Sequence, residues 1–282
     1  MSTPNLYAFA DEASKDMDGQ IRAMLRNGLQ GLEIRGVDGV NVSQITVQKA
    51  KEVRQKLDDN GLVTWSIGSP IGKIKLSDDF EAHLDVFRHT LEIADILGAK
   101  NLRMFSFYLP AGAPGLPFRQ QVMDQLGKLI EVGADSGVTL CHENEKGIYG
   151  ATVDRCLEIH KTFPTLKGIF DPANFVQCGE DTMRGWQLLQ DYIHYLHIKD
   201  ALPGGKVMPA GRGEGNVSFI VRQFLNKGGR DMTIEPHLKV FDGLKDLEAP
   251  GEESVVGELV YPDSDAAFDA ACNALKHILE VY

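Results

Sequence analysis

The stretch Val138-Thr-Leu-Cys-His-Glu-Asn-Glu145 is a short apolar, partly β-branched run that ends abruptly in polar and ionisable side chains. Residues 138–141 have the composition of a buried strand. Carboxylates crowded at the end of such a strand are costly to bury unless they meet a metal ion, a base or water. In a barrel of parallel strands, this carboxyl end is where active sites lie.

Three later segments repeat the pattern, and each is an apolar run that ends in a possible metal ligand. They are Gly168-Ile-Phe-Asp171, Tyr195-Leu-His-Ile-Lys-Asp200 and Met232-Thr-Ile-Glu-Pro-His237. Any one of these ligands would be weak evidence alone, since a single acidic residue after a strand is usually a helix cap or a solvated charge. Because four consecutive strands each supply one, we interpret them as one metal site at a common rim: Glu143, Asp171, His197 and Glu235.

The same rhythm of strand and helix runs through the chain. Apolar runs predict strands over residues 6–10, 31–34, 62–67, 101–107, 138–141, 168–171, 195–199 and 232–235. Helical spacing of apolar residues predicts helices over 21–29, 45–57, 78–97, 118–134, 153–159, 182–189, 218–225 and 265–281. Eight such units without a composition shift predict one α/β domain over residues 1–282, a (β/α)8 TIM barrel. An open doubly wound sheet would need a phosphate-binding glycine turn after the first strand, and residues 11–14 do not form one.

The net charge and the targeting signals limit the partners and the location that we expect for this protein. The formal net charge is −11, which argues against nucleic acid because backbone phosphates are bound by clustered Lys and Arg. The amino-terminal sequence has no basic segment followed by a long apolar one, and no stretch approaches a membrane-spanning length, so we expect a cytoplasmic protein without a membrane partner. The four cysteines show no Cys-x-x-Cys spacing, and we expect reduced, mostly buried thiols.

The proposed ligands form an oxygen-rich set of two glutamates, one aspartate and one histidine. Three carboxylates gathered at one rim without a cation would repel one another and raise each other's pKa values. A divalent ion removes that conflict. Carboxylate-rich sets favour Mn²⁺, Mg²⁺ or Co²⁺ over the thiolate ligands of a structural zinc site.

These four positions resemble the sugar phosphate isomerase/epimerase superfamily of xylose isomerase-like TIM barrels. The resemblance covers nearly the whole chain and rests on Cys-His-Glu143-Asn, Phe-Asp171-Pro-Ala-Asn, His197-Ile-Lys-Asp and Ile-Glu235-Pro. The glycine-rich stretch 211–215 is also similar to a loop of that family. Relatives include tagatose and psicose 3-epimerases, hydroxypyruvate isomerase and inosose dehydratase.

The resemblance implies one divalent ion, with Mn²⁺ as first choice and Mg²⁺, Co²⁺ or Zn²⁺ as alternatives. It implies an isomerase or epimerase in carbohydrate metabolism that acts on a keto-sugar or a related polyol-derived α-hydroxyketone through a metal-stabilised enediolate. Glu143 and Glu235 would be the catalytic pair, one removing a proton and the other returning one to the opposite face. Family habit also points to a homo-oligomer, although the outer helices carry no decisive pattern.

Other readings stay open at this point. The ketohexose epimerases usually carry a substrate-binding histidine where this chain has Asn174, and an arginine where it has Pro203. The sequence His197-x-Lys199-Asp200 instead resembles the inosose dehydratases, so a metal-dependent lyase acting on a keto-inositol or a 3-keto-glycoside is the runner-up. An AP endonuclease-like zinc enzyme would need more ligands and a basic surface, and a non-catalytic barrel would not need four ligands.

Four further residues are candidates for substrate binding: Asn174, Lys199, His142 and His237. Asn174 lies at the family's substrate position, and Lys199 has the same strand parity as His197 and should point inward. His142 and His237 flank the ligands, and strand alternation would point each away from its neighbour. Glu33, Lys73 and Arg103 also lie near strand ends, where single charges commonly support a site from behind or are solvated.

Overall fold

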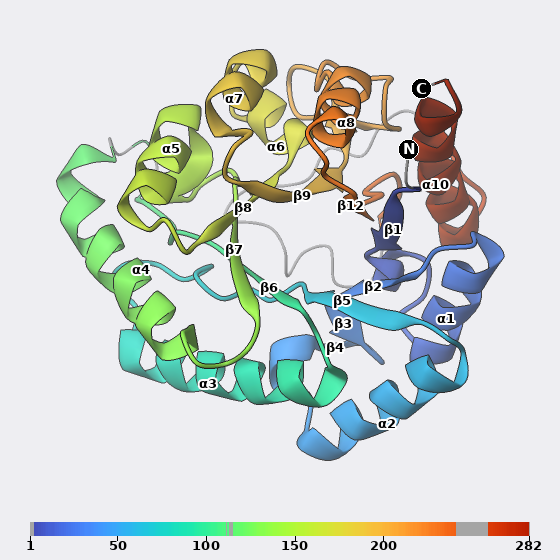
Figure 1. The fold of residues 1–282 in the computed structure, drawn as a ribbon, viewed down its shortest axis with the longest axis horizontal. Helices are drawn as coiled ribbons and strands as arrows, with labels where there is room; N and C mark the ends of the chain where they lie inside the picture. Colours follow the sequence, from blue (N-terminus) through green and yellow to red (C-terminus); the bar gives the residue numbers. More distant parts are fainter. Residues whose placement is uncertain (1–2, 111, 113–114, 241–258, 282) are drawn as a thin grey trace.

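The computed structural model describes residues 3–110, 112, 115–240 and 259–281. Eight parallel strands close into a barrel in the order β1-β12-β9-β8-β7-β6-β5-β2, which confirms the predicted (β/α)8 fold (Figure 1). Their bounds are β1 Asn5–Ala8, β2 Gly31–Ile34, β5 Val63–Ile67, β6 Asn101–Met104, β7 Thr139–Glu143, β8 Lys167–Phe170, β9 Ile193–Ile198 and β12 Asp231–Ile234.

Helices form a ring around the strands in Figure 1. They are α1 Met17–Arg26, α2 Val47–Asp59, α3 Phe80–Leu97, α4 Arg119–Gly133, α5 Val153–Thr162, α6 Pro172–Gln177, α7 Thr182–Leu189, α8 Val217–Asn226 and α10 Ser264–Glu280. Asp16, Asp79 and Asp263 each accept a hydrogen bond from a backbone amide three residues on, and therefore cap α1, α3 and α10.

Strand alternation sorts the side chains into two layers. The apolar side chains that face outward pack against the helices in one large core, whereas Cys141, Ile169 and Tyr195 form a separate buried cluster with Trp65 packed on it. These three residues precede Glu143, Asp171 and His197 by two positions, so they share a face with the ligands and lie one layer below them. The apolar layer closes the barrel interior beneath the polar one.

Several local elements differ from the sequence prediction. The strand predicted over 101–107 ends at Met104, and the chain turns at Phe107, whose φ is 66°. Short hairpins join β3 Gly36–Val37 to β4 Val40–Asn41 and β10 Asp200–Ala201 to β11 Val207–Met208. The strand β11 of the second hairpin lies within residues 203–215, which the sequence predicts to be one long glycine-rich loop. The one-and-a-half-turn helix α6 was also missed, because six residues are too few to show helical periodicity.

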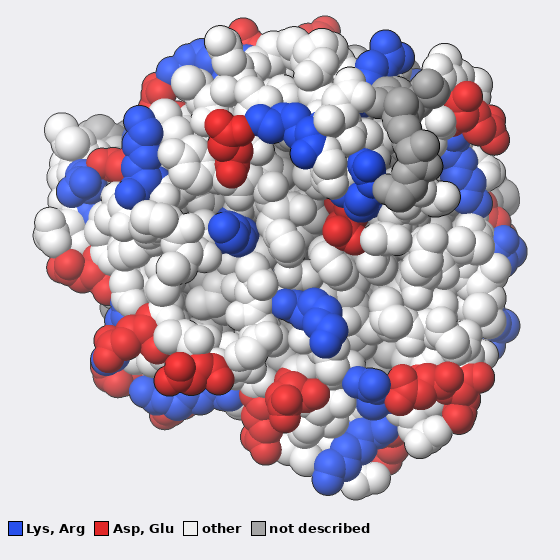
Figure 2. All heavy atoms as spheres, in the orientation of Figure 1, with Lys and Arg blue, Asp and Glu red and all other residues white. Residues whose placement is uncertain are grey.

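Figures 1 and 2 look onto the amino-terminal ends of the strands, where β1 begins and α10 ends. The Asp and Glu atoms of this face lie mainly near the rim, over α2, α3 and α4, and its centre shows mostly uncharged side chains with a few Lys and Arg and some acidic atoms (Figure 2). Much of the acidic charge visible on this face therefore lies on the outer helices. Among the described residues, no helix combines the length and the apolar character needed to cross a membrane.

Candidate functional site

The structure brings the four predicted ligands together at the carboxyl ends of four adjacent strands. Glu143 is the last residue of β7, Asp171 follows β8, His197 lies in β9 and Glu235 follows β12. All four side chains are buried, and one ligand atom of each lies within 4.8 Å of the others. Neighbouring parallel strands end at the same rim, which is why residues far apart in sequence converge here.

His197 is held by a carboxylate on each ring nitrogen. Its Nδ1 lies 2.8 Å from Glu143 Oε1 and its Nε2 lies 3.1 Å from Glu33 Oε2. Burial lowers the pKa of His197, but the two carboxylates outweigh burial and raise it to about 10. Because Glu33 can only accept, Nε2 donates to it, and this hydrogen bond leaves Nδ1 to face the ligand group. A carboxylate behind a histidine ligand is the usual way that proteins fix the ring.

Lys199 lies inside the ligand group. Its Nζ is 3.0 Å from Asp171 Oδ2 and donates a 3.0 Å hydrogen bond to Glu235 Oε2. Burial raises the pKa of Asp171, and Glu235 and Glu143 add to this, so that it reaches about 7 although Lys199 opposes the rise. For Glu235 burial acts in the same upward direction, but Lys199 and the neighbouring histidines outweigh it and hold its pKa well below the ordinary value.

Two asparagines position Asp171. Asn144 Oδ1 accepts from the Asp171 amide and Asn144 Nδ2 donates to the Asp171 carbonyl, both at 2.9 Å. The amide of Asn174 donates to Asp171 Oδ1, which caps α6, and its side chain donates to the Asn144 carbonyl and, at 3.4 Å, to Glu143 Oε1. The helix that the sequence analysis missed therefore places Asn174 against two of the ligands.

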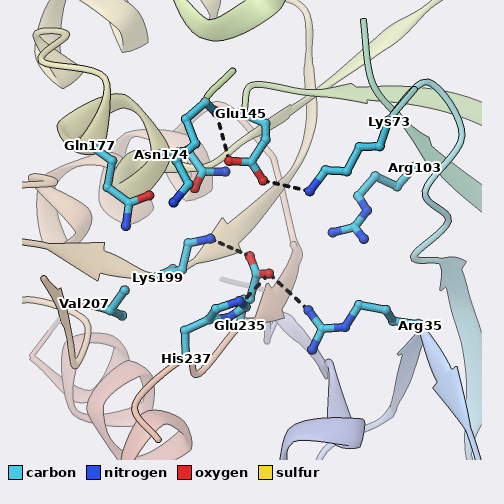
Figure 3. A pocket seen from close by; sticks show the side chains of 11 residues that line it. Arg35, Lys73, Arg103, Glu145, Asn174, Gln177, Lys199, Val207, Glu235 and His237 are labelled. Carbon is cyan, nitrogen blue, oxygen red and sulfur yellow. Dashed lines mark hydrogen bonds and ion pairs between the residues drawn. The ribbon is translucent and has the colours of Figure 1, made fainter. Parts of the chain in front are cut away.

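A polar pocket opens above the ligand group, and Glu235 is the one of the four ligands among its described lining residues (Figure 3). Three of the four predicted substrate-binding residues line it, namely Asn174, Lys199 and His237. The remaining described lining residues are Arg35, Lys73, Arg103, Glu145, Lys146, Gln177, Val207 and Glu235. Neither Arg35 nor Gln177 was singled out from the sequence; Arg35 directly follows the second strand, and that position was the available signal.

His142 and His237 differ in their placement. His142 faces away from the pocket, where its Nε2 lies 2.9 Å from Ser106 Oγ and its ring meets His160 of α5 edge-on. This position does not support the predicted role of His142 in substrate binding. His237 lines the pocket with its Nδ1 3.0 Å from Glu12 Oε1 and its backbone in the left-handed region at a φ of 44°, and its amide donates to Glu12 Oε2.

Of the three charges near strand ends, Glu33 and Arg103 are buried and Lys73 is partly buried, and all three contact residues of the site. Glu33 lies behind His197, as described above. Arg103 Nη1 lies 3.1 Å from Glu143 Oε2, and Lys73 Nζ lies 3.0 Å from Glu145 Oε2. Arg35 Nη1 lies 3.3 Å from Glu235 Oε1.

A second group of ligand-type side chains adjoins the first and shares a residue with it. It comprises Glu12, Glu235 and His237. Arg35 contacts both carboxylates of this group, at 3.0 Å and 3.3 Å. This group has one ligand-type residue fewer than the first and shares Glu235 with it, so we assign the metal ion to the first group.

The first group fits a divalent ion. It offers three carboxylates and one imidazole, the donor set of hard and intermediate divalent ions. Asp171 Oδ2 is buried and receives no hydrogen bond from any described residue, and an ammonium group lies 3.0 Å from it. A cation at this position is what three buried carboxylates require.

The sequence of residues 21–251 matches the family model described as xylose isomerase-like TIM barrel. The chain belongs to that family, and its barrel carries the buried cluster of Glu, Asp and His described above. No curated protein matches the sequence.

Solved structures with the same fold cover nearly the whole chain at low sequence identity. One is IolI with a bound zinc atom, with a TM-score of 0.75, 14% identity and 99% of each chain covered. Another is the probable 3-DHS dehydratase AsbF from Bacillus anthracis, with a TM-score of 0.73, 16% identity and coverage of 98% of this chain and 99% of that one. A third is the 3-keto-D-glucoside 4-epimerase YcjR from E. coli, with a TM-score of 0.68, 15% identity and coverage of 99% and 100%.

Proposed function

We propose that the protein is a divalent-metal-dependent isomerase or epimerase that moves a proton on the α-hydroxyketone of a keto-sugar or a polyol-derived ketone. The observation that carries the proposal is the convergence of four buried ligands beneath an open polar pocket. Glu143, Asp171, His197 and Glu235 would hold the ion. A bound divalent ion supplies Lewis acidity, which polarises a carbonyl group and makes the adjacent C–H bond more acidic.

The chain's own groups carry the proton. Glu143 and Glu235 come from β7 and the end of β12, with β8 and β9 between them in the barrel. With a substrate carbon bound between them, one of these carboxylates would remove a proton from one face of that carbon and the other would return one to the opposite face. Arg103 and Arg35 contact these two carboxylates at 3.1 Å and 3.3 Å and hold them in place.

A dehydratase is the second candidate, favoured by the position of Lys199. Its ammonium group lies in the pocket wall beside Glu235. There it can protonate a hydroxyl that leaves from the carbon next to the acidified C–H bond. The structural neighbour AsbF, titled a probable dehydratase, has the same fold.

Metal content and proton exchange test the proposal. We expect wild type reloaded with Mn²⁺ to hold about one ion per chain, and an Asp171→Ala, Glu235→Ala double variant that keeps its circular dichroism spectrum to hold none. Asp191→Asn, an exposed carboxylate on the outer surface, is the matched control and should bind as wild type does.

The second measurement follows deuterium from heavy water into a panel of ketoses and inososes. Deuterium incorporation with retention of all hydroxyl groups supports the isomerase, whereas loss of a hydroxyl group supports the dehydratase. Stoichiometric metal in the double variant, or a wild type that cannot be loaded with Mn²⁺, Mg²⁺, Co²⁺ or Zn²⁺, would refute the ligand assignment.

A further inference from the structure

Basic side chains line the pocket on the side of the barrel that supplies no metal ligand. Arg35 follows β2, Lys73 lies in the loop after β5, and Arg103 lies in β6. These three strands are neighbours in the barrel, and the four ligand strands β7, β8, β9 and β12 are also contiguous. The pocket therefore has a ligand half and a basic half, and Figure 3 shows Arg35, Lys73 and Arg103 together on one side.

Surrounding residues hold the three side chains of the basic half in fixed positions. The side chains of Arg35, Lys73 and Arg103 are at most 9% exposed. Two aromatic rings support them: Phe9 lies 4.5 Å from the Arg35 guanidinium and 4.9 Å from that of Arg103, and Phe105 lies 4.5 Å from Lys73 Nζ and 5.0 Å from Arg103. Arg103 also donates to the carbonyl of Gly68. Holding three cations in fixed positions at such burial requires this support.

The pocket lining is rich in positive charge, whereas the whole chain has a negative net charge. The described lining residues include five Lys or Arg and two Glu, in a chain with a formal net charge of −11. Glu143 contacts Arg103, and Glu235 contacts Arg35, which Asp11 and Glu12 also contact. Of these carboxylates, Glu143 and Glu235 are proposed ligands of a divalent ion. An ion that shares Glu143 and Glu235 would leave Arg103 less compensated toward the pocket, whereas Arg35 would keep Asp11 and Glu12 and lose part of its contact with Glu235.

The rest of the lining also favours a ligand with a negative charge over a neutral sugar. Besides the Lys, Arg and Glu side chains, the lining consists of Asn174, Gln177, Val207 and His237, with no Phe, Tyr or Trp among the described lining residues. A neutral sugar is commonly bound through hydroxyl partners and the apolar face of a ring. Guanidinium and ammonium groups bind carboxylates and phosphates through charge-assisted hydrogen bonds.

We propose that the substrate is an acid, and that its carboxylate or phosphate group binds to Arg35, Lys73 and Arg103 while its α-hydroxyketone faces the ligand half. The proposal rests on the proposed function for the position of the reacting carbons. It adds the substrate class and the direction in which the substrate lies across the barrel. Glu145, which accepts from Lys73, competes with the anionic group for that ammonium.

The test compares three six-carbon probes on the Mn²⁺-loaded protein by titration calorimetry: D-fructose, 5-keto-D-gluconate and D-fructose 6-phosphate. We expect at least one acid to bind about tenfold or more tightly than D-fructose, since a charge-assisted hydrogen bond contributes more than a neutral one. Which acid binds more tightly decides between a carboxylate and a phosphate. The preference should weaken as salt is raised.

Two variants of opposite expected sign make the test specific. Lys73→Met should reduce the affinity for the acid about tenfold, and Glu145→Gln should increase it, because it removes the competing carboxylate. Lys227→Met, on the outer surface, should change neither value. An anion bound to the metal ion alone would not respond to Lys73→Met.

Equal binding of the neutral and acidic probes, no binding of either acid, or acid affinities unaffected by both variants would overturn the proposal. These outcomes are distinct from failure of the proposed function, which would appear as absent metal binding and absent proton exchange. A protein that holds the ion and exchanges protons on neutral ketoses would keep the function and lose the acidic substrate.

Discussion

Lys199 and a divalent ion compete for the same carboxylates, and replacing this lysine should therefore tighten metal binding. In the structure the ammonium group lies 3.0 Å from both Asp171 Oδ2 and Glu235 Oε2, in a site that solvent barely reaches. Lys199→Met leaves these two carboxylates without their cation. Removing one partner of a buried ion pair costs about 3–5 kcal/mol.

The lower end of that range applies here, because Asp171, whose pKa is raised to about 7, can take up a proton instead. A cost of about 3 kcal/mol to the metal-free protein that the ion then removes corresponds to roughly a hundredfold gain in metal affinity at 1.36 kcal/mol per factor of ten. The metal-free variant should also melt roughly 6–10 °C lower than wild type.

The assay is competition with a fluorescent chelator at pH 8, where the proton competes least, on stripped protein reloaded with Mn²⁺. Lys199→Arg keeps the positive charge and should bind the ion about as wild type does. Lys227→Met removes an exposed lysine paired with Asp191 and serves as the surface control. If Lys199→Met binds Mn²⁺ no more tightly than wild type, or less tightly, the competition argument is wrong.

Three further predictions concern residues outside the ligand group. Burial lowers the pKa of His160 to about 4, so below its ordinary value of 6.5 the unfolded chain binds a proton that the folded chain refuses. Stability should fall by at most about 3 kcal/mol between these two pH values, at 1.36 kcal/mol per pH unit, and His160→Phe should flatten that slope in urea titrations. Asp200 accepts hydrogen bonds from three amides of the loop 211–215, and Asp200→Asn should make this loop more susceptible to limited proteolysis. Gly72→Ala should cost more than about 2 kcal/mol in chemical denaturation, because φ is 87° and the new Cβ would lie 2.1 Å from the Phe105 carbonyl oxygen.

Each of these three predictions has an outcome that would contradict it. A His160→Phe protein whose stability keeps the wild-type dependence on pH would show that this histidine does not carry the slope. For Asp200→Asn, unchanged cleavage within the loop would contradict the role of its carboxylate. Gly39→Ala has a similar φ of 81° but nothing within 4 Å of the new Cβ, so it should cost only the backbone strain. Equal losses at the two glycines would contradict the steric argument.

The sequence predicted the ligand half of the site because strand parity is a local property. Glu143, Asp171 and His197 each lie two residues after an inward-facing buried side chain. This two-residue period can be recognised in a single sequence without knowing which strands are neighbours. The barrel itself followed from the same regularity repeated eight times. The positions of strand ends were less predictable, because the turn at Phe107 depends on a backbone conformation that its side chain does not favour.

The basic half could not be predicted in this way. Lys73 follows its strand by six residues, and what brings it over Phe105 is the path of the loop, not a periodic signal. Arg35 directly follows a strand, but the carboxylates that it contacts, Asp11 and Glu235, are separated from it by 24 and 200 residues. A charge at a strand end has the same appearance in the sequence whether it is solvated or buried, because the difference lies in its partners.

The two halves also explain why the site needs both charge types. Three ionised ligand carboxylates buried together are unstable without cations, and in the metal-free protein Lys199, Arg35 and Arg103 supply them. If the site holds the proposed ion, the ion would share the carboxylates that these cations contact, and the cations would then be more available to an acidic substrate. The order of events follows: the ion should raise the affinity for an acidic substrate, and by thermodynamic reciprocity the acidic substrate should raise the affinity for the ion. Titrating Mn²⁺ with and without the preferred acid measures both sides of that cycle, and two independent affinities would show that the basic half only stabilises the fold.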